Sequence, residues 1–314
     1  MRILALVPGE IGDQILFFPT IDDLKKRYPE AQIDVVVEPR AKEAYRVSKS
    51  VNEVIAFDFQ ARNSLADWGN LLGTVRDREY EAAITLDNRW SVGFLLWLSG
   101  IPNRVGFAGG AGELFLTRSI PYKGNQYLAQ TYHDLVQGMD LSTPLPDFKV
   151  SVPAKDLQWA DQERQRLGLA SGGYVVVCGD AKSADGVYPA DNWRLILQDF
   201  QKKQPELPLV LAQTSEDDSW VKLLVEALPG LKITAPDNLG QLVAMLTGAS
   251  LVMCLNSDTM HLSIASQAFT LVLLGQADPN KLLPKNDRVL SIKSSTGQVA
   301  DIAPSTVLEK VWGG

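Results

Sequence analysis

Cysteine and histidine, which build disulfide frameworks and many metal sites, are scarce in this chain of 314 residues, with two of each. Cys178 and Cys254 each lie in a short apolar run, "YVVVC" and "LVMCL". We therefore expect two buried, reduced thiols in a cytoplasmic protein rather than a disulfide or a metal pair. Because His133 and His261 are the only histidines, a histidine-rich metal site is excluded.

Long apolar segments and basic stripes are also lacking. The longest nearly uncharged apolar stretch, "WSVGFLLWLSGI" at 90–101, is too short to span a bilayer and suits a core helix. The first apolar run, "RILALV", meets Pro8-Gly9-Glu10 after only a few residues, which does not fit a signal peptide. The formal charge is −7 and no basic stripe stands out, so we expect no nucleic-acid partner.

Apolar residues make up 46% of the chain, and short apolar runs alternate with amphipathic helical patterns. Helices are predicted from Asp13 to about Tyr28, over 41–49 and over 90–98. Pro19 should kink the first helix or tighten its first turns. This alternation predicts a mostly parallel sheet covered on both faces. The strands predicted in the first half are "RILALV", "QIDVVVEP", "VNEVIAF", "EAAITLD" and "RVGFAG".

Residues 142–160 carry three prolines and few periodic apolar positions, which indicates a connection between domains. The alternation then restarts with strands at "YVVVCG", "PLVLAQ", "LVMCLN" and "TLVLLG". Both halves repeat the plan of strand, glycine-containing loop and helix. We predict an α/β protein with two doubly wound, Rossmann-like domains, residues 1–150 and 151–314, whose strand ends face one cleft.

The loop "PGEIGD" at 8–13 follows the first strand, at the end where open α/β sheets bind ligands. Asp13 can be the N-cap of the next helix, since Asp is among the best N-cap residues. It can also be a base, and Glu10 is the other local carboxylate. The loop is not a dinucleotide fingerprint, because the glycine spacing of that motif is absent.

The stretch "CLNSDTMHLSIASQ" at 254–267 predicts a helix that begins near Thr259. Asn256, Ser257, Asp258 and Thr259 all favour N-caps, and His261 falls in the first turn. The N-terminus of such a helix presents free N–H groups and a positive dipole end, which together bind phosphate. A well-capped helix with a histidine bonded to backbone explains the same residues, so both interpretations stay open.

Taken in order and spacing, several segments resemble the ADP-heptose–lipopolysaccharide heptosyltransferase family, glycosyltransferase family nine, over most of the chain. In the N-terminal half they are Gly12-Asp13, Pro19, Leu24-Lys25, "PEAQI", "VNEVIAF" and "SGIPNRVGF"; near the end they are "MHLSIASQ" and "LVLLGQADP". The resemblance implies the GT-B architecture, with the acceptor on the N-terminal domain and a nucleotide-diphosphate sugar on the C-terminal domain.

The resemblance also assigns roles to residues. Asp13, beside Gly12, matches the catalytic base, and Asn256, Ser257, Asp258, Thr259 and His261 align with a donor-binding segment. Glu216 lies where the family has a glutamate that could accept ribose hydroxyls, although a charged helix start explains it too. Arg89 is placed to face the acceptor and to draw an anionic group, with surface solvation as the alternative.

The chain departs from the family pattern at three positions. Asn256 holds the position of an aspartate and Asp258 that of a glycine, while Gly186 stands where the family has a lysine. Lys182, in the same loop, is the candidate substitute, and a solvent-facing loop lysine is the alternative. These departures favour, as a rival, a catalytically weakened relative that binds a nucleotide or glycan.

We expect an inverting glycosyltransferase that moves a sugar from a nucleotide-diphosphate donor to an envelope glycan or glycolipid. No Asp-x-Asp motif occurs, so we expect no metal, and no cofactor apart from the donor. We also expect a cytoplasmic protein in transient contact with the inner membrane surface, and a last helix, "STVLEKVW", that packs back onto the N-terminal domain. A nucleotide-sugar epimerase is a third interpretation, but it needs more acid–base groups than we find.

Overall fold

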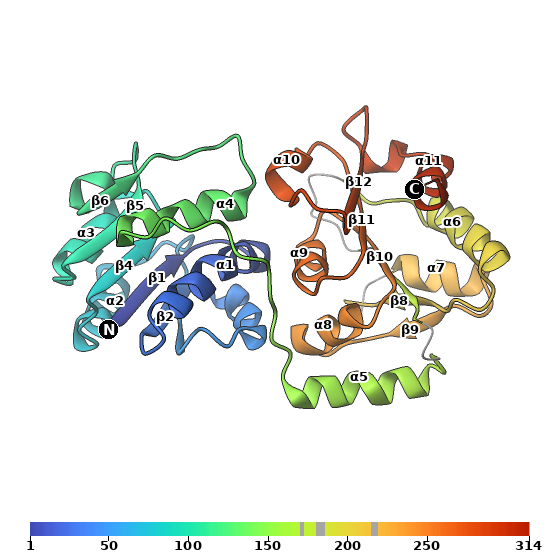
Figure 1. Ribbon diagram of the computed structural model, residues 1–314, viewed down its shortest axis with the longest axis horizontal. Coiled ribbons are helices and arrows are strands. Elements are labelled where there is room, and N and C mark those ends of the chain that lie inside the picture. Colours follow the sequence, from blue (N-terminus) through green and yellow to red (C-terminus); the bar gives the residue numbers. More distant parts are fainter. Residues whose placement is uncertain (170–172, 180–185, 215–218, 314) are drawn as a thin grey trace. The chain divides into compact units, whose positions relative to one another are not determined.

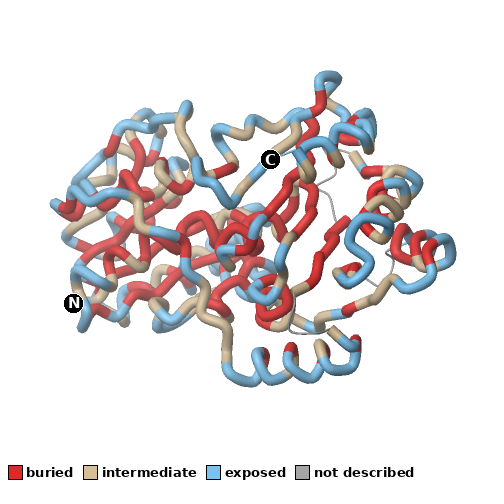
Figure 2. The backbone as a smooth tube through the Cα atoms, turned by 45° about the vertical axis from the view of Figure 1, so that its right-hand side comes forward, coloured by how far each residue is buried: buried red, intermediate tan, exposed pale blue. Residues whose placement is uncertain are grey.

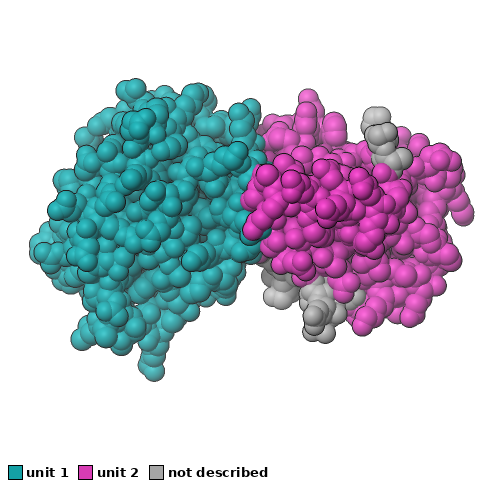
Figure 3. Space-filling view, turned by 90° about the horizontal axis from the view of Figure 1, so that it is seen from below, with its two compact units in different colours: residues 1–151 teal, residues 152–314 magenta. Residues whose placement is uncertain are grey.

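The computed structural model describes residues 1–169, 173–179, 186–214 and 219–313. The chain divides into two compact units, Met1–Ser151 and Val152–Gly314, drawn in teal and magenta in Figure 3. This division falls one residue from the predicted domain boundary. Each unit is a parallel α/β domain, so the predicted fold class is confirmed.

Unit 1 has a six-stranded sheet in which every strand pairs in parallel, in the order β3-β2-β1-β4-β5-β6. Its helices lie on both faces of the sheet (Figure 1). The strands are β1 Arg2–Val7, β2 Gln32–Val37, β3 Glu53–Ala56, β4 Ala82–Thr85, β5 Asn103–Phe107 and β6 Arg118–Ile120. The helices are α1 Ile11–Arg27, η1 Pro39–Val47, α2 Leu65–Asp77, α3 Trp90–Leu98, η2 Glu113–Phe115, α4 Leu128–His133 and η3 Asp134–Met139, where η marks a 3-10 helix.

Unit 2 repeats the same winding with the order β12-β11-β10-β7-β8-β9, again parallel throughout. Its strands are β7 Val175–Cys178, β8 Leu209–Ala212, β9 Lys232–Thr234, β10 Leu251–Leu255, β11 Thr270–Leu274 and β12 Val289–Lys293. Its helices are α5 Ala154–Arg166, α6 Ala190–Lys203, α7 Ser219–Ala227, α8 Leu239–Thr247, α9 Asp258–Ala265, α10 Pro279–Leu282, η4 Val299–Asp301 and α11 Pro304–Trp312.

The central strands form the core of each unit, as the red tube of Figure 2 shows. Residues 3–7 of β1 have no exposed surface, and neither do residues 175–178 of β7. Because helices cover both faces of each parallel sheet, side chains on both sides of a central strand are buried. This explains the continuous apolar runs in the sequence. Cys178 and Cys254 are free and buried, as predicted.

Two predicted helices differ from the observed ones. α1 begins at Ile11, two residues before the predicted start, and Pro19 lies inside it without ending it. The predicted helix over 41–49 is a 3-10 helix at Pro39–Val47. Its buried residues are Ala41, Ala44, Tyr45 and Val47, and three of them recur at the three-residue spacing of a 3-10 helix.

The last helix, α11, packs against α6 of its own unit. Val307 of α11 belongs to the core of unit 2. The Trp312 indole N–H donates to Asp199 at 2.8 Å, and its ring lies 4.7 Å from that of Phe200. Because the sequence of α11 fits any apolar face, only the contacts decide which unit it covers.

We expect Trp312→Ala to lower the free energy of unfolding by about 1–2 kcal/mol, because it removes both the ring packing and the hydrogen bond. Trp312→Phe, which keeps a ring on Phe200 but loses the N–H donor, should cost about half as much. Urea unfolding followed by circular dichroism measures both. Equal stability of all three proteins would show that α11 does not contribute to the core of unit 2.

Candidate functional site

The strand order of unit 1 reverses between β1 and β4, because the chain leaves β1 toward β2 and leaves β4 toward β5. Ligands of open α/β sheets bind outside the carboxyl ends of the strands at such a point. Asp13 lies in the first turn of α1, after β1. Asp87 and Arg89 follow β4 directly. The residues selected from the sequence on the acceptor side therefore lie at this point of the fold.

Asp13 is held by two hydrogen bonds. The backbone N–H of Glu10 donates to Asp13 Oδ2 at 3.0 Å, and the hydroxyl of Tyr132 donates to Asp13 Oδ1 at 3.0 Å. The N-cap residue is Glu10, so the interpretation of Asp13 as the N-cap is corrected: Asp13 is the third helical residue and bonds back to the cap. Its neighbour Gly12 is buried in the same turn.

Gly9 makes room for this arrangement. Its φ of +114° lies in a region that side chains rarely adopt, and a Cβ there would lie 2.3 Å from Asp13 Oδ2. The glycine before the helix is therefore required by the position of the carboxylate, not by a nucleotide.

Tyr132 connects Asp13 to a cavity. Burial first, and then the charge of Asp13 and the hydrogen bond to it, raise the pKa of the Tyr132 hydroxyl. The hydroxyl therefore stays protonated and serves as a donor at physiological pH. Tyr132 also lines a cavity of about 510 Å³, whose other lining residues are Pro8, Leu86, Asp87, Asn88, Arg89, Phe107, Ala108, Gly109 and Tyr122.

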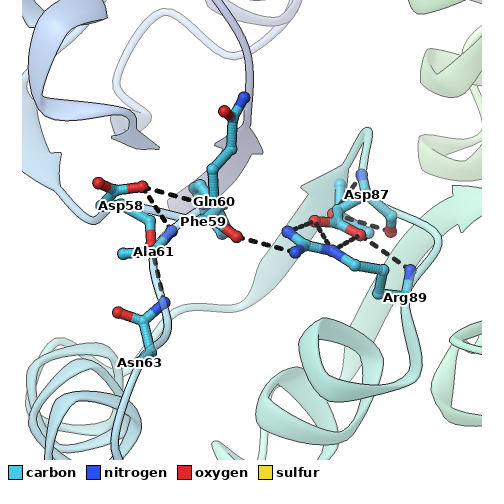
Figure 4. Close-up of polar contacts among 8 residues, drawn as sticks. Asp58, Phe59, Gln60, Ala61, Asn63, Asp87 and Arg89 are labelled. Atoms are coloured by element: carbon cyan, nitrogen blue, oxygen red, sulfur yellow. Dashed lines mark hydrogen bonds and ion pairs between the residues drawn. The ribbon is translucent and has the colours of Figure 1, made fainter.

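Arg89 lines this cavity, but its charge is already balanced. Its guanidinium forms a two-oxygen ion pair with Asp87, and Nε lies 3.0 and 2.9 Å from the two carboxylate oxygens (Figure 4). Nη1 donates to the carbonyl of Phe59 at 2.8 Å, which ties the loop after β3 to the loop after β4. The hydrogen bond with Asp87 is the main reason that the pKa of Arg89 is raised.

Two further carboxyl groups, Glu38 and Asp58, follow β2 and β3. Glu38, after β2, is buried, and burial followed by a hydrogen bond with Asp58 raises its pKa. Asp58 accepts the backbone N–H groups of Gln60 and Ala61 at 2.9 Å each, and these bonds lower its pKa (Figure 4). The two shifts are opposite, so Glu38 is the more readily protonated of the two carboxyl groups.

Sequence reasoning missed Tyr132, Glu38, Asp58 and Asp87. Three of them carry a usable signal, since Glu38 and Asp87 lie at the ends of predicted strands and Asp58 directly follows one; all three come within two residues after an observed strand. Tyr132 carries none, because it is 119 positions from Asp13 and α4 is short.

The matching point of unit 2 lies between β7 and β10, where the order reverses again. α9 begins there at Asp258 with Ser257 as N-cap, as predicted. Ser257 is 3% exposed, and its hydroxyl has no hydrogen-bond partner among the residues described. A buried hydroxyl without a partner at a helix N-terminus points to a polar ligand, and the positive end of the helix dipole favours an anion.

The other predicted donor residues divide into two sets. Thr259 and His261 are buried in the first turn of α9, and Asn256 and Asp258 are partly exposed beside it. Lys182 and Glu216 lie outside the described residues, so the structure says nothing of their place.

Membrane-spanning helices and clusters of metal-binding side chains are both absent from the described part of the chain. No helix there is long and apolar enough to cross a membrane. Within the same ranges, no cluster of three or more His, Cys, Asp or Glu side chains could hold a metal ion.

Two Rossmann-like domains, one with a clasped carboxylate and one with a phosphate-compatible helix N-terminus, define a protein of the GT-B glycosyltransferase architecture. The model of glycosyltransferase family 9 (heptosyltransferase) matches residues 68–311, and this chain belongs to that family. The resemblance noted in the sequence is thereby confirmed. The match begins after Asp13, so it carries no information on that residue.

Individual relatives are distant but extend over the whole chain. Lipopolysaccharide heptosyltransferase 2 of Salmonella typhimurium is 24% identical over 351 residues, covering 99% of this chain and 97% of the relative. The photosynthetic NDH subunit of subcomplex B 1 of Arabidopsis thaliana is 23% identical over 338 residues, covering 98% of this chain and 72% of the relative. The solved structure of E. coli ADP-heptose lps heptosyltransferase II has a TM-score of 0.80 at 20% identity, covering 99% and 97% of the two chains.

We expect Glu38→Gln to change how stability depends on pH. A carboxyl group whose folded pKa is raised contributes stability that is full at acidic pH and is lost as pH rises through the folded pKa. The amide keeps the hydrogen-bonding shape without this titration. The variant should therefore have the higher Tm at about pH 8, by about 2–4 °C, and lose this advantage toward about pH 5.

Differential scanning fluorimetry across this pH range measures the difference in Tm between wild type and variant. Glu43→Gln, an exposed glutamate on the same η1 segment, is the control and should give a flat difference. A flat difference for Glu38→Gln as well would show that the pKa of Glu38 is not raised in the folded protein.

Proposed function

We propose that this protein transfers a sugar, with inversion, from a nucleotide-diphosphate donor to a hydroxyl of an envelope glycan or glycolipid. The observation that carries the proposal is the Asp13 carboxylate, which accepts hydrogen bonds from the Glu10 N–H and from the hydroxyl of Tyr132, a residue that lines the cavity at the reversal point of unit 1. Family membership supports the reaction class, while the role of Asp13 rests on this geometry and on the sequence resemblance.

In this mechanism Asp13 accepts the proton of the acceptor hydroxyl as that oxygen attacks the anomeric carbon. A carboxylate has about four acceptor sites, so the two donors that hold Asp13 leave room for a substrate hydroxyl. Holding both oxygens in place reduces the number of orientations that the carboxylate must lose during the reaction. The bonds to Glu10 and Tyr132 position the base in this way.

The departing diphosphate needs positive potential, and the N-terminus of α9 with the Ser257 hydroxyl is our proposed site for it. Donors from backbone and hydroxyl groups can supply this potential without a metal, which agrees with the absence of an Asp-x-Asp motif. ADP is the first nucleotide to test, because a protein of the same fold is an ADP-heptose transferase. No further cofactor is proposed.

The acceptor hydroxyl is proposed to enter the cavity of about 510 Å³ in unit 1. Since Asp87 already neutralises Arg89, we no longer assign Arg89 to an anionic acceptor group; it orders the cavity wall instead. We place the protein in the cytoplasm, where its two free thiols stay reduced and envelope precursors are reached at the inner membrane surface.

One observation favours a second candidate, a nucleotide- or glycan-binding module without transfer activity. Asp258 is the first residue of α9 and carries a carboxylate next to the proposed diphosphate site. A negative charge there opposes a second anion. That one relative is named as a subunit of a photosynthetic complex agrees with a non-catalytic role in some proteins of this kind. Transfer assays separate the two candidates.

We expect Asp13→Asn to reduce kcat by roughly 10²–10⁴-fold, because an amide cannot accept the proton. It still accepts the bond from Glu10, so the loss of stability should be only about 0.5 kcal/mol. Asp67→Asn is a matched control, since Asp67 makes the same contact to the N-cap of α2, with Ser64 N–H at 2.8 Å.

The assay follows sugar transfer from a donor chosen by a thermal-shift screen of nucleotide sugars, with a panel of glycan and glycolipid acceptors. If Asp13→Asn turns over at the wild-type rate, Asp13 is not the catalytic base, and Glu10 becomes the next candidate for it. Donor binding by the wild type without transfer to any acceptor would favour the binding module.

We expect Ser257→Ala to weaken binding of ADP by about 5–10-fold, through loss of one hydrogen bond. Since the hydroxyl has no partner among the described residues, its removal should leave Tm unchanged or slightly higher. Ser266→Ala removes a hydroxyl from the opposite end of α9 and is the control. Calorimetric titration with equal affinity for both variants would remove Ser257 from the site.

A further inference from the structure

An apolar groove of about 420 Å³ lies between α2 and α3 of unit 1. Its walls are mainly Trp68 and Leu72 of α2 and Trp90, Phe94, Leu95 and Leu98 of α3. No charged side chain lines it among the residues that the structure describes, which distinguishes it from the cavity beside Arg89.

The rim of the groove exposes more large apolar surface than a helix of a folded domain normally leaves in water. Among the lining residues, Leu65 is 92% exposed, Trp90 60% and Leu98 40%. α3 is apolar on every side, "WSVGFLLWL", although only part of it is buried in unit 1. Such a surface is expected to have a ligand that covers it.

The groove adjoins the cavity along the chain. Asn88 and Arg89 line the cavity, and the next residue, Trp90, lines the groove as the first residue of α3. Gly110 and Gly112 pack so closely on this junction that a Cβ at either would lie within 2.6 Å of the Asn88 or Arg89 backbone or side chain. The polar cavity and the apolar groove are therefore held next to each other by a well-packed turn.

We propose that the groove binds a single hydrocarbon chain of an amphiphile whose polar part occupies the cavity. This inference rests on the proposed function in that it identifies the acceptor as a lipid-linked molecule. A sugar or base in the groove would find few polar side-chain groups, those of Asn63 and Ser91 and the indole N–H groups of the two tryptophans, and unpaired polar groups are costly to bury. A hydrocarbon chain needs no such partners, and its transfer from water is favourable.

The size and position of the groove also favour a chain over a protein partner. A stable protein interface buries about 800 Å² on each side and combines an apolar centre with a polar rim. Here the apolar lining is concentrated in a narrow slot, and its polar continuation is the cavity of the candidate site rather than a rim.

Gly69 offers a direct way to fill the groove. It lines the groove from α2, and a Cβ placed there would meet no atom within 4 Å. Gly73, one turn further along α2, is equally open but does not line the groove. Gly69→Leu and Gly73→Leu thus add the same side chain to the same helix with equal gain in helix propensity, and only the first occupies the groove.

The experiment titrates octyl, nonyl and decyl maltoside, each below its critical micelle concentration, into wild type, Gly69→Leu and Gly73→Leu, with calorimetric detection. The affinity of wild type and Gly73→Leu should rise about fourfold with each added methylene. Gly69→Leu should bind decyl maltoside at least about tenfold more weakly and lose the dependence on chain length. Circular dichroism and Tm establish that both variants are folded.

Equal chain-length dependence in Gly69→Leu and Gly73→Leu would overturn the proposal, and so would a wild-type affinity that ignores chain length. Binding of wild type to phosphatidylcholine vesicles without binding of monomeric maltosides would replace the single chain with a bilayer surface. No donor is present, so the result does not depend on sugar transfer. Groove binding without transfer in the separate enzyme assay would count against the proposed function alone.

Discussion

Parallel pairing around a buried central strand determines where every candidate group of unit 1 lies. β1 pairs with β2 on one side and with β4 on the other, with Leu6 opposite both Val36 and Thr85. Because both faces are covered, the neighbouring strands are the main partners of its backbone. The same register brings the ends of β1 and β4 level, and the oppositely directed connections leave Asp87 lining a cavity and Asp13 bonded to Tyr132, which lines the same cavity. Unit 2 repeats the constraint with β7 and β10.

Carboxylates outnumber cations at this edge, and this affects which acceptors fit. Both nearby guanidinium groups are engaged, Arg89 with Asp87 and Arg40 with Glu10 at 2.8 Å. An edge with surplus negative charge suits a neutral, hydroxyl-rich group better than an anionic one. Burial and the neighbouring Asp58 raise the pKa of Glu38, which favours its neutral form and so reduces the repulsion. The carboxyl groups are Glu10, Asp13, Glu38, Asp58 and Asp87.

Local patterns predicted what depends on local energetics. The apolar runs predicted the strands, and the cluster of cap-forming residues predicted the start of α9 to within one position. The start of α1 differs from the prediction because "PGEIGD" holds two carboxylates, and spacing alone does not show that Asp13 bonds back to the backbone N–H of Glu10. The bond from Tyr132 to Asp13 depends on how α4 packs against α1, which only the tertiary structure provides.

The helix α3 explains why one segment contributes to both a polar and an apolar site. An apolar helix normally lies wholly in a core, but α3 starts at the sheet edge, where its N-cap Arg89 must reach Asp87 and the Phe59 carbonyl. Trp90 and Trp97 of this helix remain 60% and 52% exposed. The boundary between polar and apolar surroundings thus falls at the peptide bond between Arg89 and Trp90. A ligand that follows the surface across this bond must change its own polarity at the same place, which is the defining property of an amphiphile.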